Sequence, residues 1–498
     1  MSVPSALSPF ADLFQERTLL RSFDDSLLEN FLYDSVSPTA EEWPAHSGLS
    51  FTFTNDGYYN VFAAPSPTTI DPSPSSRRAE QYDVTLSNFN GTDDIDATQA
   101  QGMLADYAVQ TYNRLGINAA ATMDAVARGV YTTAATAGWT VADGAQVATT
   151  SLRVKRLNGF CANLPTAGTS LRWQAVSGGN PLAILVSGTQ SVSVIGFIAD
   201  NSIVVDQGVG VPDINGPGVL LLSAAVTVAD RDPVIAENAS VVQRVGDGVN
   251  RKTGRIDNVN GPLSYFEFQE AKRRLSQAAV KPRRDMAMNY LVHVSPSGYQ
   301  QLQNDPAYQR LNFARGIEEL AITRGVVGMV SQMLFVENNN APSADTVNWR
   351  TTPEGPRTPA TYGTITKDGV AKVSTDPIGI EVLAGVAQDR QIDTTVVFGD
   401  DATKRYWQPH PLLGDVAKLK EIGISGVLAE PFQVVNDSVL LSTSYTSMIM
   451  ISPRNRTADK FPVTWQSKQS FTVKSDQVAS AGGKIRYKRV VAIQSLAS

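Results

Sequence analysis

Near the start of the chain, large apolar residues recur at the three- and four-residue spacing of a helix. The pattern runs from Pro9 to Val36 with charged residues in between, and it is typical of one or two amphipathic helices. Breakers follow at Ser37, Pro38 and Trp43-Pro44, so this short segment has to bury its apolar side on a surface outside itself. We expect an arm that docks elsewhere; a core helix of an ordinary globular domain is the alternative. The apolar positions taken as candidate contact residues are Phe10, Leu13, Phe14, Phe23 and Phe31.

The residues after this arm alternate between apolar and polar. Phe51 and Phe53 alternate with threonines, and a turn signal follows at Asn55-Asp56-Gly57, which predicts hairpin-like extended chain. Prolines and serines then form a segment that cannot sit inside a sheet, and alternation resumes over Tyr82–Leu86. The pattern therefore predicts two strands that flank a long polar tip. Phe51 and Phe53 join the candidate contact residues.

The polar tip carries two adjacent basic residues, Arg77 and Arg78. One hypothesis is that they contact acidic residues of a neighbouring subunit. The other is a solvated pair that contributes little, because exposed ion pairs are typically worth only ~0–1 kcal/mol. Both arginines are kept as candidate contact residues, with the two interpretations left open.

A long helix is predicted next. Asp96 and Gln99 have the spacing of a capping pair, and apolar residues from Leu104 to Val126 then mark one face of a helix that runs past Arg128. A helix of this length is unusual in a globular domain.

From Gly138 to Gly248 the chain changes to short β-rich runs punctuated by glycine and proline, which indicates an inserted β domain. Its clearest predicted strands are Ser151–Arg156, Leu182–Ser187 and Ser191–Phe197. The longest apolar run of the chain, Val219–Val228, falls well short of the ~20 residues that cross a bilayer. We expect no membrane partner.

The remainder is predicted to form a mixed α/β body. Ser264 and Glu267 have the capping-box spacing in front of a helix, and Tyr290–Val294 follows as a strand. Further predicted helices are Ser297–Leu302 and Ile317–Thr323, and further buried strands are Val326–Val336 and Asp393–Phe398. Near the C-terminus the predicted strands are Val439–Ser444, Ser447–Ile451, Gln469–Val473 and Ile485–Ile493, so we expect the chain to end in a sheet.

Composition narrows the class of protein. Hydrophobic residues make up 42% of the chain and charged residues 18%, which is enough apolar material for hydrophobic cores. A chain of 498 residues is expected to divide into roughly three domains. The net charge of −6, with both signs interspersed, argues against a protein whose main task is to grip nucleic acid. A single cysteine, Cys161, and the lack of a signal-like N-terminus fit synthesis in a reducing compartment.

Patterns that carry catalysis or bind metals are missing from the sequence. His46, His293 and His410 are far apart, and no serine sits in a Gly-x-Ser-x-Gly elbow. Gly482-Gly483-Lys484 lacks the remaining residues of a phosphate-binding loop. The acidic pairs Asp24-Asp25, Asp93-Asp94 and Asp400-Asp401 are more typical of helix starts and turns than of cation sites. We expect no catalytic residue, no metal and no cofactor, and hence no enzyme.

Three segments are similar to the HK97-like coat proteins of tailed bacteriophages. The sharpest is Tyr290–Leu311, a strand–Pro–helix–Asp segment, continued by Val326–Asn339; the others are Val154–Phe160 and Gly216–Asp247. The order of predicted elements over roughly residues 95–498 resembles the same proteins. The resemblance implies an α+β, HK97-like capsid fold with an N-terminal arm, an extended β-hairpin loop, a long spine helix, a β-rich insertion, and axial and peripheral domains.

The resemblance also implies a division of the chain and a function. The expected parts are the arm (1–45), the extended loop (46–92), a peripheral domain with the spine helix (93–137), the β-rich insertion (138–250), an axial domain (251–431), and strands that return to the peripheral domain (432–498). The expected function is that of a structural major capsid protein. Copies would assemble in the host cytoplasm into hexamers and pentamers of an icosahedral head. The protein would then be located in the capsid of the virion.

Further expected partners are a portal protein, scaffolding and decoration proteins, and packaged double-stranded DNA in non-specific contact. The residues that could face DNA are the loop Arg251–Arg255 with Lys272, Arg273, Arg274, Arg283 and Arg284, although solvated or ion-paired side chains are the simpler interpretation. A phage tail, fibre or surface-binding β-rich protein is the alternative, but no internal repeat supports it. A hydrolase whose site converges only in space is a third hypothesis, and it would require a deep pocket with perturbed titratable groups.

Overall fold

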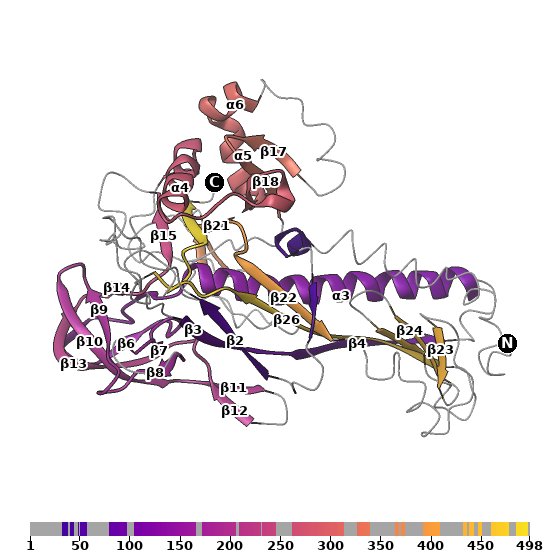
Figure 1. The fold of residues 1–498 in the computed structure, drawn as a ribbon, viewed down its shortest axis with the longest axis horizontal. Coiled ribbons are helices and arrows are strands. Elements are labelled where there is room, and N and C mark those ends of the chain that lie inside the picture. Colours follow the sequence, from indigo (N-terminus) through magenta and orange to yellow (C-terminus); the bar gives the residue numbers. More distant parts are fainter. Residues whose placement is uncertain are drawn as a thin grey trace, which may run out of the picture. The chain divides into compact units, whose positions relative to one another are not determined.

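A computed structural model describes residues 32–37, 40–43, 48, 50–56, 79–96, 104–165, 172–205, 209–230, 232–245, 261–312, 326–338, 364–367, 370–373, 392–408, 432–435, 438–442, 447–450, 460–477 and 485–496. Helices and strands are both abundant in these ranges, so the predicted α+β class is confirmed (Figure 1). The chain forms two compact units: 1–51, 84–127 and 404–472 make the first, and 52–83, 128–403 and 473–498 make the second.

The longest element is helix α3 (Leu104–Ala135), which confirms the long helix predicted to run past Arg128. Its buried apolar positions recur every three or four residues and include Leu115, Ala119, Met123 and Ala127. The predicted cap at Asp96 is wrong, because Asp96 ends strand β4 (Ser87–Asp96) and pairs there with Lys460. The pair Asp93-Asp94, predicted at a helix start or turn, lies in the same strand, where a long run of pairing with β26 overrides the local capping signal.

The first unit contains a seven-stranded sheet in the order β1-β22-β26-β25-β24-β23, with β4 also paired to β26. These strands are β1 (Ala40–Glu42), β22 (Thr403–Gln408), β26 (Lys460–Val473), β25 (Ser447–Met450), β24 (Ser438–Ser442) and β23 (Phe432–Val435). Helix α3 packs on one face: the Trp465 indole donates to Asn118 Oδ1 at 3.1 Å, and Gln469 Nε2 lies 3.1 Å from Met123 Sδ. Three of the predicted C-terminal strands are thus confirmed within this sheet.

The β-rich stretch of the second unit forms an antiparallel sheet of six strands in the order β5-β14-β9-β10-β13-β6. These are β5 (Trp139–Val141), β6 (Gln146–Val154), β9 (Leu182–Val186), β10 (Gln190–Ala199), β13 (Gly218–Val228) and β14 (Pro233–Ala236). The strands predicted from alternation are confirmed. Alternate side chains enter one core, which includes Leu152, Ile184, Val194 and Leu220.

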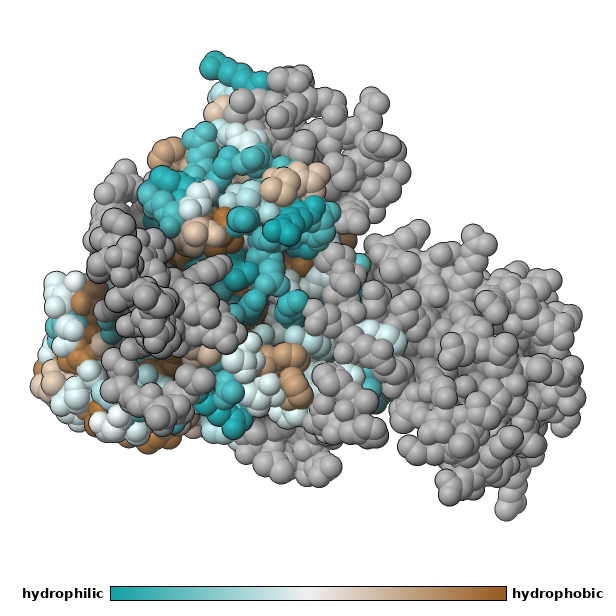
Figure 2. All heavy atoms as spheres, in the orientation of Figure 1, coloured by the Kyte–Doolittle hydropathy of each residue, from teal (hydrophilic) through white to brown (hydrophobic). Residues whose placement is uncertain are grey.

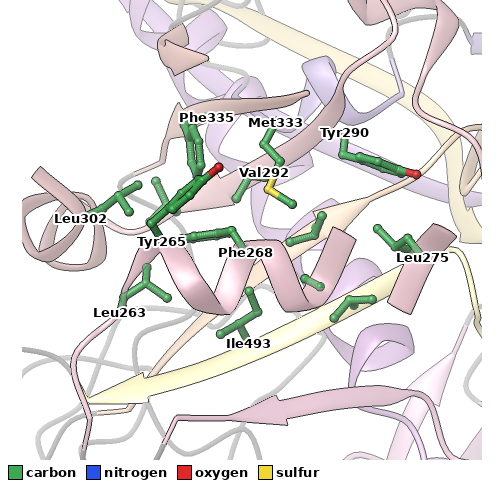
Figure 3. Close-up of a cluster of buried hydrophobic side chains, with 14 of the residues drawn as sticks. Leu263, Tyr265, Phe268, Leu275, Tyr290, Val292, Leu302, Met333, Phe335 and Ile493 are labelled. Atoms are coloured by element: carbon green, nitrogen blue, oxygen red, sulfur yellow. The ribbon is translucent and has the colours of Figure 1, made fainter. Parts of the chain in front are cut away.

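A second six-stranded sheet of this unit has the order β15-β27-β21-β16-β18-β17. Its strands are β15 (Val241–Arg244), β27 (Val490–Leu496), β21 (Ile392–Phe398), β16 (Tyr290–Val294), β18 (Met333–Glu337) and β17 (Val326–Val330). All five side chains of β16 are buried, since helices α4 (Tyr265–Gln277) and α5 (Pro296–Asn304) supply side chains to the core on one face. Figure 3 shows Phe268 of α4 beside Phe335 of β18 and Ile493 of β27 in this core.

Three local predictions in the second unit are wrong. The Ser264 side chain makes no capping hydrogen bond, and the buried Glu267 carboxylate instead accepts from Gln243, so no capping box forms. The run Val326–Val336 is two strands, because Ser331 and Gln332 both take positive φ and form a tight hairpin turn. The sequence does not predict this turn, since it lacks the glycine or asparagine that such turns usually contain. The last predicted strand begins at Val490 and joins this sheet, so the C-terminal strands divide between two sheets.

The remaining elements of the described residues are short. They are η2 (Leu32–Val36), β2 (Ser50–Asp56), β3 (Ala79–Thr85), β7 (Ala162–Asn163), β8 (Gln174–Ala175), β11 (Ser202–Val205), β12 (Val209–Pro212), η5 (Arg284–Met286), α6 (Pro306–Asn312), β19 (Thr364–Lys367) and β20 (Val370–Val373). Strands β2 and β3 pair only with each other in the described sheets, as a two-stranded ribbon. The predicted helix Ile317–Thr323 lies outside the described residues.

Candidate assembly surfaces

The candidate contact residues divide into two groups. Phe10, Leu13, Phe14, Phe23 and Phe31 of the arm, and Arg77 and Arg78 of the tip, lie outside the described residues. Phe51 and Phe53 lie in strand β2 of the ribbon. The surfaces that the structure describes are the β2–β3 ribbon, the C-terminal end of the arm, and the outer face of the β-rich sheet.

The ribbon joins two segments on either side of the polar tip, as predicted, but its pairing differs from the predicted hairpin. Asn55 and Asp56 lie within β2 and make no turn, and β2 pairs with β3. Phe53 stacks on Tyr82 of β3, with ring centroids 6.0 Å apart and an interplanar angle of 29°. Phe51, in the first unit, meets Trp43 edge to face at 6.3 Å. Both phenylalanines are half-buried against their own chain.

Side chains alternate strictly across the ribbon. Asn55 reaches Glu80 at 3.5 Å on the face that also carries Phe53 and Tyr82. The opposite face holds the hydrogen bonds from Thr52 Oγ1 to Asp83 at 2.6 Å and from Gln81 Nε2 to Thr54 Oγ1 at 3.4 Å. Each face of the ribbon therefore presents its own set of groups to the rest of the second unit.

Groups of the second unit reach both of these faces. The Asn55 side-chain amide donates to the Ser475 carbonyl at 2.6 Å, and Glu80 next to it is fully buried. On the other face Arg172 forms an ion pair with Asp83. The hydrogen bond from Arg172, and a second one from Thr52, hold the pKa of the Asp83 carboxyl below its ordinary value. Asp83 is therefore ionised at neutral pH.

The C-terminal end of the predicted arm is anchored within the first unit. Residues Leu32–Val36 form a short 3₁₀ helix, and the Tyr33 backbone N–H donates to the buried Asp124 carboxylate of α3 at 2.8 Å. Asp34 accepts from the Arg405 guanidinium at 2.6 Å. This end of the arm is thus fixed, and any contact that the arm makes with another molecule starts from a defined point.

The outer face of the six-stranded β-rich sheet carries both apolar and polar residues, since Arg153 lies opposite Val219 and Ser151 opposite Leu221. Ile198 pairs with Val219 across β10 and β13, and Leu221 lies two residues further along β13 on the same face. Ile198 is 56% exposed, whereas Val219 and Leu221 are half-buried. Figure 2 shows hydrophilic side chains over α4 and α5, with paler and browner ones over β9, β10 and β13. Exposed apolar residues on this face are therefore interspersed with polar and charged ones.

The His293 imidazole and the Cys161 thiol lie in surroundings that disfavour their charged forms. Burial lowers the pKa of His293 to about 3, so its imidazole is neutral, and its Nδ1 lies 3.0 Å from the Asn338 amide. Burial raises the pKa of the Cys161 thiol to about 12, far from a reactive thiolate. An open groove of about 830 Å³ in the second unit is lined by Glu237, Arg273, Arg274 and Lys488 among its charged residues. The described lining of that groove contains no histidine or cysteine.

Several of the charged residues singled out in the sequence form ion pairs within the chain. The Asp401 carboxylate accepts from Lys474 at 2.8 Å and from Arg489 at 3.2 Å. Arg273 and Arg274 both bind Glu270, and Arg283 binds Asp285. Across the described ranges no group of three metal-ligating side chains occurs, and no helix there has the length and apolar character needed to cross a bilayer. Arg251–Arg255, His46 and His410 lie outside these ranges.

No protein-family model matches the chain, and no curated protein matches its sequence. Solved structures similar to it include the capsid of Ralstonia phage GP4, with 10% identity over 92% of this chain and 87% of that chain and a TM-score of 0.44. The capsid of cyanophage Pam1 gives 10% identity over 91% and 86%, with a TM-score of 0.42. The head of Helicobacter pylori bacteriophage KHP40 gives 8% over 92% and 87%, with a TM-score of 0.38. At such identities and TM-scores, function has to be argued from this chain's own residues.

Proposed function

We propose that this chain is the major capsid protein of a tailed bacteriophage. Copies of it would assemble as hexamers and pentamers into an icosahedral head that encloses double-stranded DNA. This is the class of the capsid and head structures named above, but the support comes from the residues of this chain. The function is structural and requires no active site, metal or cofactor.

The observation that carries the proposal is the β2–β3 ribbon. A two-stranded ribbon is marginally stable by itself in water, and it offers unpaired edge groups to another chain. In this protein both strands of the ribbon are held by buried and charged contacts, while the chain between them is rich in proline and serine and ends in Arg77-Arg78. A ribbon whose strands are held and whose tip is polar is suited to reach across and pair with a neighbouring copy.

Repeated contacts explain how such a subunit could build a shell. Each interface can be modest, because many copies of it act together in a closed lattice, and symmetry requires every subunit to offer complementary surfaces. The ribbon and the arm would supply these surfaces. Weak individual contacts also allow early mistakes in assembly to be corrected.

The division of labour along the chain belongs to the same proposal. Residues 1–45 would act as the arm, 46–92 as the extended loop, 93–137 and 432–498 as the peripheral part, 138–250 as the insertion and 251–431 as the axial part. A portal protein, scaffolding and decoration proteins would be partners, and assembly would take place in the host cytoplasm. Contact with packaged DNA would be local and non-specific, since Arg273 and Arg274 of α4 are both held by Glu270.

Electron microscopy of the full chain, purified alone and after co-expression with a scaffolding protein, tests the proposal. Closed shells or flat hexameric sheets are the expected result. Trimeric rods would support the tail or fibre alternative. Discrete monomers under every condition would contradict assembly and reopen the hydrolase hypothesis.

A further inference from the structure

We propose that Asp83 and Arg172 are positioning residues that set the direction in which the β2–β3 ribbon leaves the second unit. The inference rests on the proposed function, in which the ribbon reaches a neighbouring copy. It goes beyond that function because it names the contact that aims the ribbon. The observation behind it is that groups of one unit hold both faces of the ribbon, with Asn55 and Glu80 next to the tip and Asp83 further from it.

The first hold is on the face that carries Asn55 and Glu80. Asn55 is 7% exposed and donates to the Ser475 carbonyl at 2.6 Å, which ties β2 to the segment that follows β26. Glu80 is fully buried and interacts electrostatically with Arg486 and Lys488. A buried carboxylate that loses its cations is costly, so this contact is a fixed anchor.

Arg486, one of the two cations near Glu80, is itself fixed by neighbouring groups. The Arg486 guanidinium lies 4.5 Å from the centre of the Trp173 ring and donates to the Ala162 carbonyl at 2.8 Å. Trp173 is the residue after Arg172, and Ala162 belongs to β7. The segment that carries Arg172 is therefore tied to the same cluster that receives Glu80.

The second hold is on the opposite face of the ribbon. The Arg172 guanidinium pairs with Asp83 on this face, and the backbone of Arg172 forms a parallel bridge to Gln81 along the edge of β3. Thr52 of β2 donates to the same carboxylate at 2.6 Å, so one charged group joins both ribbon strands to the segment at Arg172. The side chains remain open to solvent, at 58% for Arg172 and 38% for Asp83.

Two holds on opposite faces constrain the ribbon in a way that one cannot. Glu80 and Asp83 are three residues apart, so their side chains point to opposite faces about 10 Å apart along the strand. A single anchor would leave the ribbon free to swing about it, whereas a second contact on the other face opposes that rotation. The exposed pair adds little to global stability. Its loss should therefore change the ribbon's direction and leave the fold intact.

A charge exchange tests this role. We compare the parent with Asp83→Arg, Arg172→Asp and the double variant that carries both, in the full chain. The single variants are expected to place two like charges together and to lower the yield of regular shells by about tenfold, because the defect repeats at every copy of the lattice. The double variant should recover most of the yield. Thermal unfolding should be unchanged in all three.

Asp143→Arg is the matched control, because the Asp143–Arg153 pair has similar exposure, 37% and 49%, and lies away from the ribbon on the β-rich sheet. It should assemble as the parent does. Shells of normal yield from both single variants would overturn the inference. So would a double variant that recovers nothing, or a control variant that fails equally.

A second measurement separates failure of the inference from failure of the proposed function. Spin labels at Thr54→Cys and Val147→Cys, both exposed in the second unit, report the distance from the ribbon to the β-rich sheet in a Cys161→Ser background. The distribution should be narrow in the parent, broad in each single variant and narrow again in the double variant. These distances without any parent shells would retain the positioning role and refute the capsid function. The same distance distribution in the parent, both single variants and the double variant would refute the positioning role, whether or not shells form.

Discussion

Gly159 shows how much one backbone position can decide in the β-rich part of the second unit. It takes a φ of +85°, and a Cβ at this position would lie 2.0 Å from the backbone nitrogen of Gly138. That nitrogen donates to the Asn158 carbonyl at 3.0 Å, so the two turns touch through their backbones. Gly144 has almost the same φ, +82°, but open space surrounds it. A side chain at Gly144 would meet only backbone strain, whereas one at Gly159 would also clash with neighbouring atoms.

We therefore predict different costs for the same substitution at these two positions. Gly144→Ala should lower the free energy of unfolding by only about 1–2 kcal/mol, the cost of a left-handed conformation for a residue with a Cβ. Gly159→Ala should cost at least about 3 kcal/mol, because the turns must also move apart. Urea unfolding of the two variants measures both values. Equal costs would contradict the close approach to Gly138.

At the scale of elements, helix α4 illustrates how a sheet becomes buried. Phe268 is fully buried and meets Phe335 of β18 edge to face, with ring centroids 5.0 Å apart. Two residues earlier on the same helix, Phe266 is 57% exposed. Phe268 therefore lies on the face of α4 that enters the core and Phe266 does not, although both are phenylalanines.

The same helix supplies a matched pair of substitutions. Phe268→Ala should lower the free energy of unfolding by about 3–5 kcal/mol, since it leaves a cavity in the core shown in Figure 3. Phe266→Ala should change it by only about 0.5 kcal/mol, as is usual at exposed positions. Calorimetric or urea unfolding of both variants checks the contrast. A large effect at Phe266 would mean that its surface is covered by another part of the protein.

Glu270 on α4 makes the contribution of charge testable by pH. Hydrogen bonds from Arg273, above all, and from Arg274 lower the pKa of the Glu270 carboxyl from 4.5 to about 2. Because the pKa in the folded state is the lower one, the stabilisation is fully present above pH 4.5 and is lost as the pH falls towards 2. The difference in unfolding free energy between the parent and Glu270→Gln should therefore shrink between these values. A difference that stays constant with pH would contradict the ion pairs.

At the scale of the whole molecule, assembly depends on segments that a single subunit need not use for its own core. The arm pattern around Phe14 and Phe23 is apolar enough to require a partner surface. Its end is fixed in the first unit through Tyr33, which donates to Asp124. A docked arm of this kind would contribute to each contact between copies, and the lattice would multiply that contribution.

Polar substitutions in the arm test that role. Phe14→Ser together with Phe23→Ser should sharply reduce shell formation, seen by electron microscopy and sedimentation, while far-UV circular dichroism and the unfolding midpoint stay the same. Glu16→Ser with Glu29→Ser, on charged positions of the same pattern, serves as the control and should still assemble. Unfolding of the Phe variant would instead show that the arm completes this subunit's own core.

Elements whose pattern follows from burying one face could be predicted from the sequence. Helix α3 and strand β16 have such patterns, a three-to-four spacing and a continuous apolar run, and both were placed correctly. Phe51 and Phe53 were likewise placed in a strand. Their contacts with Trp43 and Tyr82 were missed, because alternation shows which side chains share a face but not what covers that face.

The partner of a polar group was decided only by the tertiary structure. Arg172 meets Asp83 across 89 residues of sequence, and Asp96 pairs in a strand where its local spacing predicted a cap. Burial produces a periodic pattern in the sequence, because the side chains on one face of a helix or strand all pack into the same core. A pairing between distant residues leaves no such period, since many carboxylates and guanidinium groups could satisfy one another equally well. The sequence alone thus determined the class of fold and its longest elements, and the folded chain selected which strands pair and which charges meet.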